Sequence, residues 1–184
     1  MCSSDLILPA QKFGIPVWLK NTMDEKAAGT LISDKSPRGE FKAVAAKDGI
    51  TAIRIKSSRM LLAYGFMRKI FEIFEKYRTP IDMVTTSEIA VSVTIDDPKN
   101  LDKILHELGD LGTIETDTQQ TIICIVGNML TENEGVLNQV FAALKNIPVR
   151  MVSFGGSPNN ISILINASDK DRALNLLNEG LFNL

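Results

Sequence analysis

The segment of residues 60–96 combines a predicted anion site with a fixed negative charge. Gly65 and Phe66 follow a predicted strand and begin an amphipathic helix. The first N–H groups of a helix have no partner within the helix and lie at the positive end of its dipole, so they attract a carboxylate. Asp82 begins the next predicted strand and offers a carboxylate to an ammonium group. Together these features predict a site for a free amino acid with a side-chain amine, and they indicate a sensor more than a catalyst.

Neighbouring side chains offer further ligand contacts. The polar corner of Thr86, Ser87 and Glu88 supplies two hydroxyls and a second carboxylate, although a plain polar connection between strands explains each of them equally well. Met60 and Met67 flank the loop before the helix, where a flexible thioether side chain either closes on an aliphatic ligand or fills the core.

The composition is that of an ordinary globular protein. The 184 residues are 45% hydrophobic, and 20 basic against 22 acidic residues give a formal net charge of −2. Without a long basic run or a long apolar run, neither nucleic acid nor a membrane is an expected partner. Cys2 and Cys124 are far apart, and Cys124 lies in an apolar run, which predicts free thiols and a cytoplasmic location. His106 is the only histidine, so no metal site is expected.

Two parts of the chain repeat the same order of patterns. Alternating apolar residues predict strands, and apolar residues at intervals of three and four predict helices. The first repeat has predicted strands at 50–57, 81–85, 88–95 and 113–116 and predicted helices at 65–78 and 100–111. The second has predicted strands at 121–129, 149–154 and 160–165 and predicted helices at 131–145 and 168–178. The sequence therefore predicts an α+β fold of two ferredoxin-like βαββαβ units.

The second repeat lacks its closing strand, which would leave an open sheet edge over apolar helices. Residues 41–49, upstream of the first repeat, are the best candidate for that strand. The first unit is therefore predicted to be inserted into the second, and residues 121–184 are expected not to fold alone. The expected domains are 50–118 for the first unit, and 41–49 with 119–184 for the second.

The leader of residues 1–40 is interpreted as the end of another domain and a linker. It contains a short strand-like run around Trp18, and its first eleven residues are too few to predict an element of their own. Met1 is interpreted as an expression start within a longer natural chain.

Nearly the whole chain from about Leu8 resembles the C-terminal regulatory part of monofunctional, lysine-sensitive aspartokinases, in the runs PVWLKNT, AAGTLIS, MLLAYGFMRKIFEIFEKYRTPIDMVTTSEIAVSVTID and VRMVSFGGSPNNISILI. The resemblance implies two ACT domains that bind lysine as a feedback inhibitor. The inhibited reaction would be the phosphorylation of aspartate by ATP, the first step of lysine, threonine and methionine biosynthesis. A free-standing ACT-type amino-acid-binding protein, and threonine as the effector, remain alternatives.

The resemblance also implies partners: a second copy, through the first ACT domain, and the kinase domain of the same full-length chain. ATP and Mg belong to that kinase domain, and this chain has no glycine-rich phosphate loop after a strand, so it is expected to need no cofactor and to be inactive as a kinase. The run GGSPNN at 155–160 lies between two predicted strands and is interpreted as a hairpin turn.

The effector-binding residues are carried over by the same resemblance. Gly65 and Phe66 would bind the effector's carboxylate through their backbone, and Asp82, after Ile81, would bind its ammonium group. Ala63 stands where lysine-sensitive members carry a serine, which removes a hydroxyl from the expected pocket. The full expected site comprises Met60, Ala63, Gly65, Phe66, Met67, Ile81, Asp82, Thr86, Ser87 and Glu88.

Overall fold

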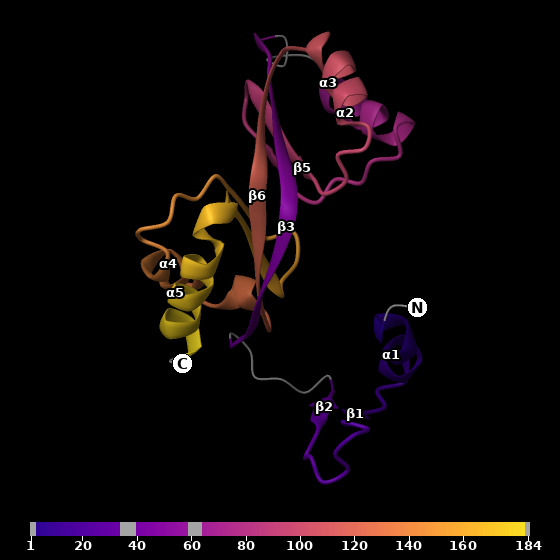
Figure 1. Cartoon of the computed structure of the whole chain (residues 1–184), viewed down its shortest axis with the longest axis vertical. Helices are drawn as coiled ribbons and strands as arrows, with labels where there is room; N and C mark the ends of the chain where they lie inside the picture. Colours follow the sequence, from indigo (N-terminus) through magenta and orange to yellow (C-terminus); the bar gives the residue numbers. More distant parts are fainter. Residues whose placement is uncertain (1–2, 34–39, 59–63, 183–184) are drawn as a thin grey trace. The chain divides into compact units, whose positions relative to one another are not determined.

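The computed structural model describes residues 3–33, 40–58 and 64–182, which belong to two compact units, Met1–Arg38 and Gly39–Leu184 (Figure 1). Each unit has its own secondary structure. The first contains α1 (Ser3–Lys12) and an antiparallel pair of short strands, β1 (Val17–Leu19) and β2 (Thr30–Ile32).

Helix α1 corrects the expectation that the first eleven residues form no element. The helix forms although Pro9 lies inside it. Ile7 and Gln11, one turn apart, line a hollow of about 560 Å³ together with Val17 and Leu31 from the two strands. No local pattern in the sequence reveals this helix, which lies beside the strand pair at the hollow.

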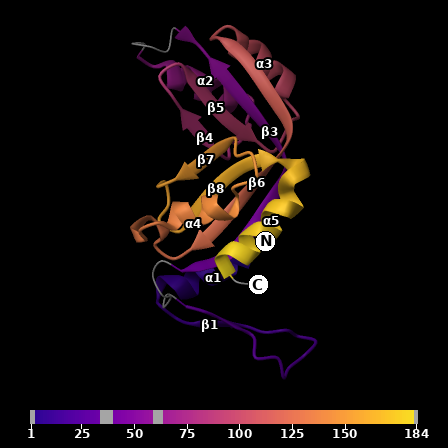
Figure 2. The same ribbon diagram turned by 90° about the vertical axis from the view of Figure 1, so that its left-hand side faces the viewer.

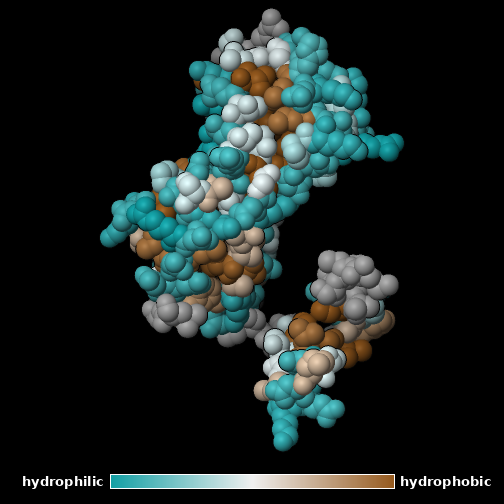
Figure 3. Space-filling view, in the orientation of Figure 1, coloured by the Kyte–Doolittle hydropathy of each residue, from teal (hydrophilic) through white to brown (hydrophobic). Residues whose placement is uncertain are grey.

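The first unit carries an apolar surface. Phe13, Ile15, Trp18 and Leu19 are each more than half exposed, and Figure 3 shows apolar side chains gathered on this unit. The interpretation of residues 1–40 as the end of another domain stays a prediction, and an exposed apolar patch is typical of a surface that packs against a further part of a protein.

The second unit is built on one antiparallel sheet with the strand order β4-β5-β3-β6-β8-β7. Two 3₁₀ turns, Leu130–Glu132 and Ala167–Asp169, precede the last two helices. The elements in chain order are β3 (Phe41–Lys56), α2 (Phe66–Lys76), β4 (Val84–Thr86), β5 (Ala90–Ile95), α3 (Leu101–Gly109), β6 (Thr113–Gly127), α4 (Val136–Ala143), β7 (Met151–Phe154), β8 (Asn160–Asn166) and α5 (Lys170–Phe182).

Two lobes share the long strands β3 and β6. In lobe 1, residues 51–56 of β3 pair with β5, and residues 50–56 of β3 pair with residues 113–120 of β6. Strand β4 and the helices α2 and α3 complete this lobe. In lobe 2, residues 41–47 of β3 pair with residues 122–127 of β6, beside β8, β7, α4 and α5. The two helix pairs lie on opposite sides of the β3–β6 ribbon (Figures 1 and 2). This confirms the α+β fold of two ferredoxin-like units with the first inserted into the second.

The structure corrects the strand lengths. The sequence predicted four separate strands at 41–49, 50–57, 113–116 and 121–129, but they form the two continuous strands β3 and β6. Gly49 (φ 75°) and Gln119 (φ 57°) interrupt the patterns because each lies where the β3–β6 register shifts, on either side of the pair Ile50 and Gln120. A bulge bends a strand and changes which face its side chains occupy, while the ladder continues beyond it.

Alternation along the shared strands divides the core into three clusters. Ile53 and Ile55 of β3 pack beneath α2 and α3, whereas Ile123 and Ile125 of β6 pack beneath α4 and α5. The third cluster combines residues from both lobes: Ile50, Ala52, Met83, Ile122, Met151 and Leu164. Because all six are buried, the lobes share one hydrophobic contact in addition to the two continuous strands β3 and β6.

Among the described residues, no helix combines the length and the apolar character that crossing a membrane requires.

Candidate functional site

The start of α2 has the backbone geometry of an anion site. Gly65 lies at the N-cap with φ 80° and ψ 8°, a left-handed conformation that glycine adopts without a steric penalty. Phe66 is 8% exposed and its ring belongs to the lobe 1 core, and Met67 packs partly against the same core. Only the backbone of Phe66 is therefore available to a ligand. Met60 and Ala63 lie outside the described residues.

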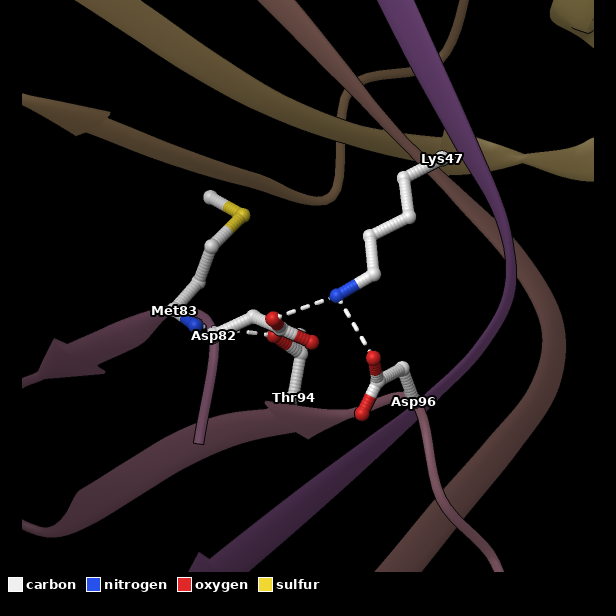
Figure 4. A network of polar contacts seen from close by, with 5 residues as sticks. All are labelled: Lys47, Asp82, Met83, Thr94 and Asp96. Carbon is white, nitrogen blue, oxygen red and sulfur yellow. Dashed lines mark hydrogen bonds and ion pairs between the residues drawn. The ribbon is translucent and has the colours of Figure 1, made fainter. Parts of the chain in front are cut away.

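Asp82 lies in a polar network before β4 (Figure 4). Its backbone N–H donates a hydrogen bond to the Thr94 carbonyl oxygen (2.9 Å), and the Met83 N–H donates to Thr94 Oγ1 (2.9 Å). Lys47 Nζ lies 2.7 Å from Asp82 Oδ1 and 2.7 Å from Asp96 Oδ2. The sequence predicts a carboxylate that is open to a ligand's ammonium group, but in the structure the ammonium group of Lys47 already pairs with it.

The charges of this network support one another. Hydrogen bonds to Asp82 and then to Asp96 raise the pKa of Lys47, because both favour its charged form. The hydrogen bond from Lys47 in turn holds the pKa of Asp96 below its ordinary value. The network therefore sets one ammonium group, that of Lys47, against the side-chain carboxyl groups of Asp82 and Asp96.

An open groove of about 240 Å³ reaches the Asp82 side chain. Its walls include Ala45, Met83, Ile122 and Cys124, and Ser162 contributes a hydroxyl. The groove is mostly apolar and has its charged groups at Lys47 and Asp82, which suits an aliphatic chain that ends in a charge.

The polar corner after β4 lies at the other end of lobe 1. Thr86 pairs with Val91, which pairs with Ile55 near the end of β3, and the Ser57 N–H donates to the Ile89 carbonyl oxygen (2.9 Å). The Ser87 N–H closes a turn onto Ala90 (2.8 Å). Glu88 is exposed.

Part of this corner lines a polar hollow of about 370 Å³. Thr86 and Ser87 share it with Arg54 and Ser92 of lobe 1 and with Arg150, which precedes β7. Both arginines have acidic partners: Arg54 lies 3.4 Å from Glu115, and Arg150 forms an ion pair with Asp117. The hollow is therefore lined by polar residues of both lobes, and the charge of each of its two arginines is balanced by an acidic partner.

Helix α2 separates the two halves of the predicted site within one chain. Gly65 precedes its first turn, whereas Ile81 and Asp82 follow its last turn. A helix of 11 residues is about 16 Å long, far more than the four methylene groups of a lysine side chain span. One lysine therefore cannot contact the helix start and Asp82 of the same copy, and the combination of the two groups in one effector site stays a prediction.

In the loop before α4, which corresponds in lobe 2 to the loop before α2, backbone N–H groups already donate hydrogen bonds within the chain. Gly135 begins α4 with φ 79°, as Gly65 begins α2. The N–H groups of Gly127, Met129 and Leu130 donate to the Asn159 carbonyl oxygen, to Asn159 Oδ1 and to the Pro158 carbonyl oxygen respectively. These donors are already paired, so this loop fits a structural role better than ligand binding.

Four charged residues of the network and the hollow were missed by the sequence analysis: Lys47, Arg54, Asp96 and Arg150. Lys47 and Asp82 are 35 positions apart and meet only because β3 crosses from lobe 2 into lobe 1. No local spacing signals such a contact. Over residues 3–33, 40–58 and 64–182, no group of three or more histidine, cysteine, aspartate or glutamate side chains is placed to hold a metal ion.

The Lys47–Asp96 pair predicts a loss of stability in acid. Because the pKa of Asp96 is lower in the folded chain than its ordinary value of 3.8, the pair's contribution is complete above about pH 4 and is lost as the pH falls through the lowered pKa. Between about pH 5 and pH 2, the midpoint temperature of thermal unfolding should therefore fall less steeply with decreasing pH for Asp96→Asn than for the unchanged chain. Equal slopes for the two proteins would contradict this role of the pair.

Known proteins share this fold and much of this sequence. A family description of the ACT domain matches residues 123–181. A solved domain described as a C-terminal regulatory domain of aspartate kinase from Porphyromonas gingivalis W83 is 53% identical, with a TM-score of 0.70, and the match covers 77% of this chain and 97% of that domain. Escherichia coli aspartokinase III in complex with lysine and aspartate is 30% identical, with a TM-score of 0.83, over 97% of this chain and 41% of that protein.

The curated relatives agree. Lysine-sensitive aspartokinase 3 of E. coli K12 is 30% identical over 185 residues, which cover 96% of this chain and 41% of that protein. The two lobes are therefore ACT domains with the ferredoxin-like fold described above. The chain belongs to the regulatory regions of aspartokinases, as the sequence resemblance indicated. It spans less than half the length of this curated relative.

Proposed function

We propose that this chain is the effector-binding regulatory region of an aspartokinase and that its effector is lysine. The observation that carries the proposal is the carboxylate of Asp82, held at the end of an apolar groove by hydrogen bonds from the backbone around it to Thr94. A relative with the same fold over 97% of this chain is described as a complex with lysine and aspartate.

The groups of the site suit the two ends of lysine. The backbone at Gly65 and Phe66, at the positive end of the α2 dipole, binds a carboxylate. Asp82 binds the side-chain ammonium in a charge-assisted hydrogen bond, which threonine cannot supply. The polar corner of Thr86, Ser87 and Glu88 lies at the end of lobe 1 where α2 begins, and it adds polar contacts there. Ile81 adds apolar surface beside Asp82.

A second copy of the chain would complete this site. Since α2 separates Gly65 from Asp82, one lysine touches both groups only where lobe 1 of one copy lies against lobe 1 of another. Phe71 on α2 and Ile89 beside the polar corner are large apolar side chains that are 39% and 45% exposed, and such surface favours association. The kinase domain of the same full-length chain, with ATP and Mg, is the proposed partner that the effector inhibits.

Homodimer formation through lobe 1 is a direct prediction. Light scattering at micromolar concentration is expected to give about twice the 20.2 kDa mass of one chain. Phe71→Glu is expected to give the monomer mass, because a charge replaces apolar contact surface. Phe141 on α4 is also 39% exposed, so Phe141→Glu is the matched control and should remain a dimer. A monomer with and without lysine, or dissociation by the control alone, would show that lobe 1 is not the interface.

Calorimetric titration with lysine, threonine and methionine tests the effector. Lysine is expected to bind at least tenfold more tightly than threonine or methionine, because only lysine carries a side-chain ammonium group that can pair with Asp82. Tighter binding of threonine than of lysine would show that threonine, the alternative effector, is the ligand of this site. Binding of none of the three would overturn the proposed function.

A further inference from the structure

Lys47 links the two lobes through the carboxylate proposed to bind the effector. It lies on the part of β3 that pairs with Ile122 in lobe 2, directly before the bulge at Gly49. Its partners Asp82 and Asp96 both belong to lobe 1, and Figure 4 shows the Lys47 side chain reaching between their carboxylates. The pair therefore crosses from one lobe to the other.

The Lys47 contact is of a kind that a ligand can replace. The side chains of Lys47, Asp82 and Asp96 are 47%, 24% and 39% exposed, so water competes for all three. Exposed ion pairs contribute little net stability. Lys47 also carries the same ammonium group on the same aliphatic stem as free lysine, so replacing one by the other preserves the charge balance at Asp82.

Space for the replacement lies beside the pair. The groove of about 240 Å³ that reaches Asp82 is lined by Lys47 as well as by Met83 and Ile122. A ligand that enters with its ammonium toward Asp82 contacts apolar walls along its stem, and Lys47 retains Asp96 as a partner or turns into water.

We propose that Lys47 is an internal competitor for the effector's ammonium group: it holds Asp82 in the ligand-free chain and is displaced when the effector binds. This inference rests on the proposed function and names its regulation. It makes Lys47 a residue that sets effector affinity, because each binding event must first release the internal pair. It also gives the effector a means of acting on lobe 2, because displacement removes an ion pair between the lobes while the Arg150–Asp117 pair remains.

Titration of lysine into Lys47→Met tests the proposal. With no internal ammonium, Asp82 is open to the ligand, and lysine affinity is expected to rise about fivefold, the range of one exposed ion pair. Lys47→Gln serves as a second uncharged variant should the methionine variant not fold. Lys47→Arg keeps a cation beside Asp82 and is expected to bind lysine within about twofold of the unchanged chain.

Lys170→Met is the matched control. Lys170 Nζ lies 2.8 Å from Asp48 Oδ2, one residue after Lys47, so the variant removes an equal charge and a similar pair from the same part of the molecule without freeing Asp82. Its lysine affinity is expected to be unchanged. Equal gains in Lys170→Met and Lys47→Met would assign the effect to net charge and overturn the proposal.

The remaining outcomes separate this inference from the proposed function. Lysine affinity that is unchanged or lower in folded Lys47→Met, with binding by the unchanged chain intact, would overturn the competitor role alone. Lysine binding by Lys47→Met but not by the unchanged chain would support it strongly. Absence of lysine binding in every variant would overturn the proposed function and this inference with it.

Discussion

A chain that begins at Ile50 is expected to lose the cooperative folding of lobe 2. Residues 41–47 supply the strand that pairs with residues 122–127 of β6, and Phe41 and Val44 pack against the core beneath α4 and α5. Without them, β6 becomes an open edge and the core loses one wall. The net free energy of unfolding of a domain is only about 5–15 kcal/mol. Removing the hydrogen bonds and core contacts of a whole strand is therefore expected to unfold lobe 2.

The control for that experiment is a chain that begins at Gly39, the first residue of the second unit. It retains all of β3 and is expected to unfold in one cooperative transition, whether followed by near-ultraviolet circular dichroism or by calorimetry. A cooperative transition of the same size in the chain that begins at Ile50 would show that lobe 2 closes its sheet without β3. The same reasoning predicts that residues 121–184 do not fold alone.

Asp82→Asn is expected to weaken lysine binding by more than tenfold, or about 1.4 kcal/mol, because it removes the charge and keeps the shape. Norleucine has the length of lysine without the ammonium, so its affinity should be the same for the variant and for the unchanged chain. The comparison of the two ligands isolates the contact between carboxylate and ammonium. Equal losses for lysine and norleucine would show that Asp82 shapes the site and does not bind the ammonium.

The stability of Asp82→Asn needs a different explanation from the one the sequence suggests. The sequence predicts almost no change because no internal partner of Asp82 is visible, but the structure supplies Lys47 as a partner. The expected loss is still below about 1 kcal/mol, because the pair is partly exposed and Lys47 retains Asp96. Thermal unfolding of the variant without ligand measures this cost separately from binding.

The sequence predicts the fold well because apolar periodicity is dense in both repeats. Of the helix face predicted from Phe66, Ile70, Phe71 and Phe74, α2 buries all but Phe71, which is 39% exposed. The placement of residues 41–49 in the second unit follows from an element count, since an unfilled sheet edge is costly. The strand lengths could not be predicted, because Gly49 and Gln119 have the backbone conformation of turns and lie in bulges.

The candidate site was predicted less completely than the fold. Local patterns predict ligand contacts at the helix start at Gly65 and at the carboxylate of Asp82, but they contain no information on the distance between these two groups. That distance depends on the direction of α2 along the sheet. The partner of Asp82 depends on the crossing of β3 between lobes, so Lys47 becomes visible only in three dimensions.

Equilibrium dialysis with labelled lysine tests the central claim most directly. We expect saturable binding of one labelled lysine per chain, which unlabelled lysine displaces and an equal concentration of threonine does not. Absence of saturable binding, or displacement by threonine as effective as displacement by lysine, would contradict the proposal that this regulatory region senses lysine.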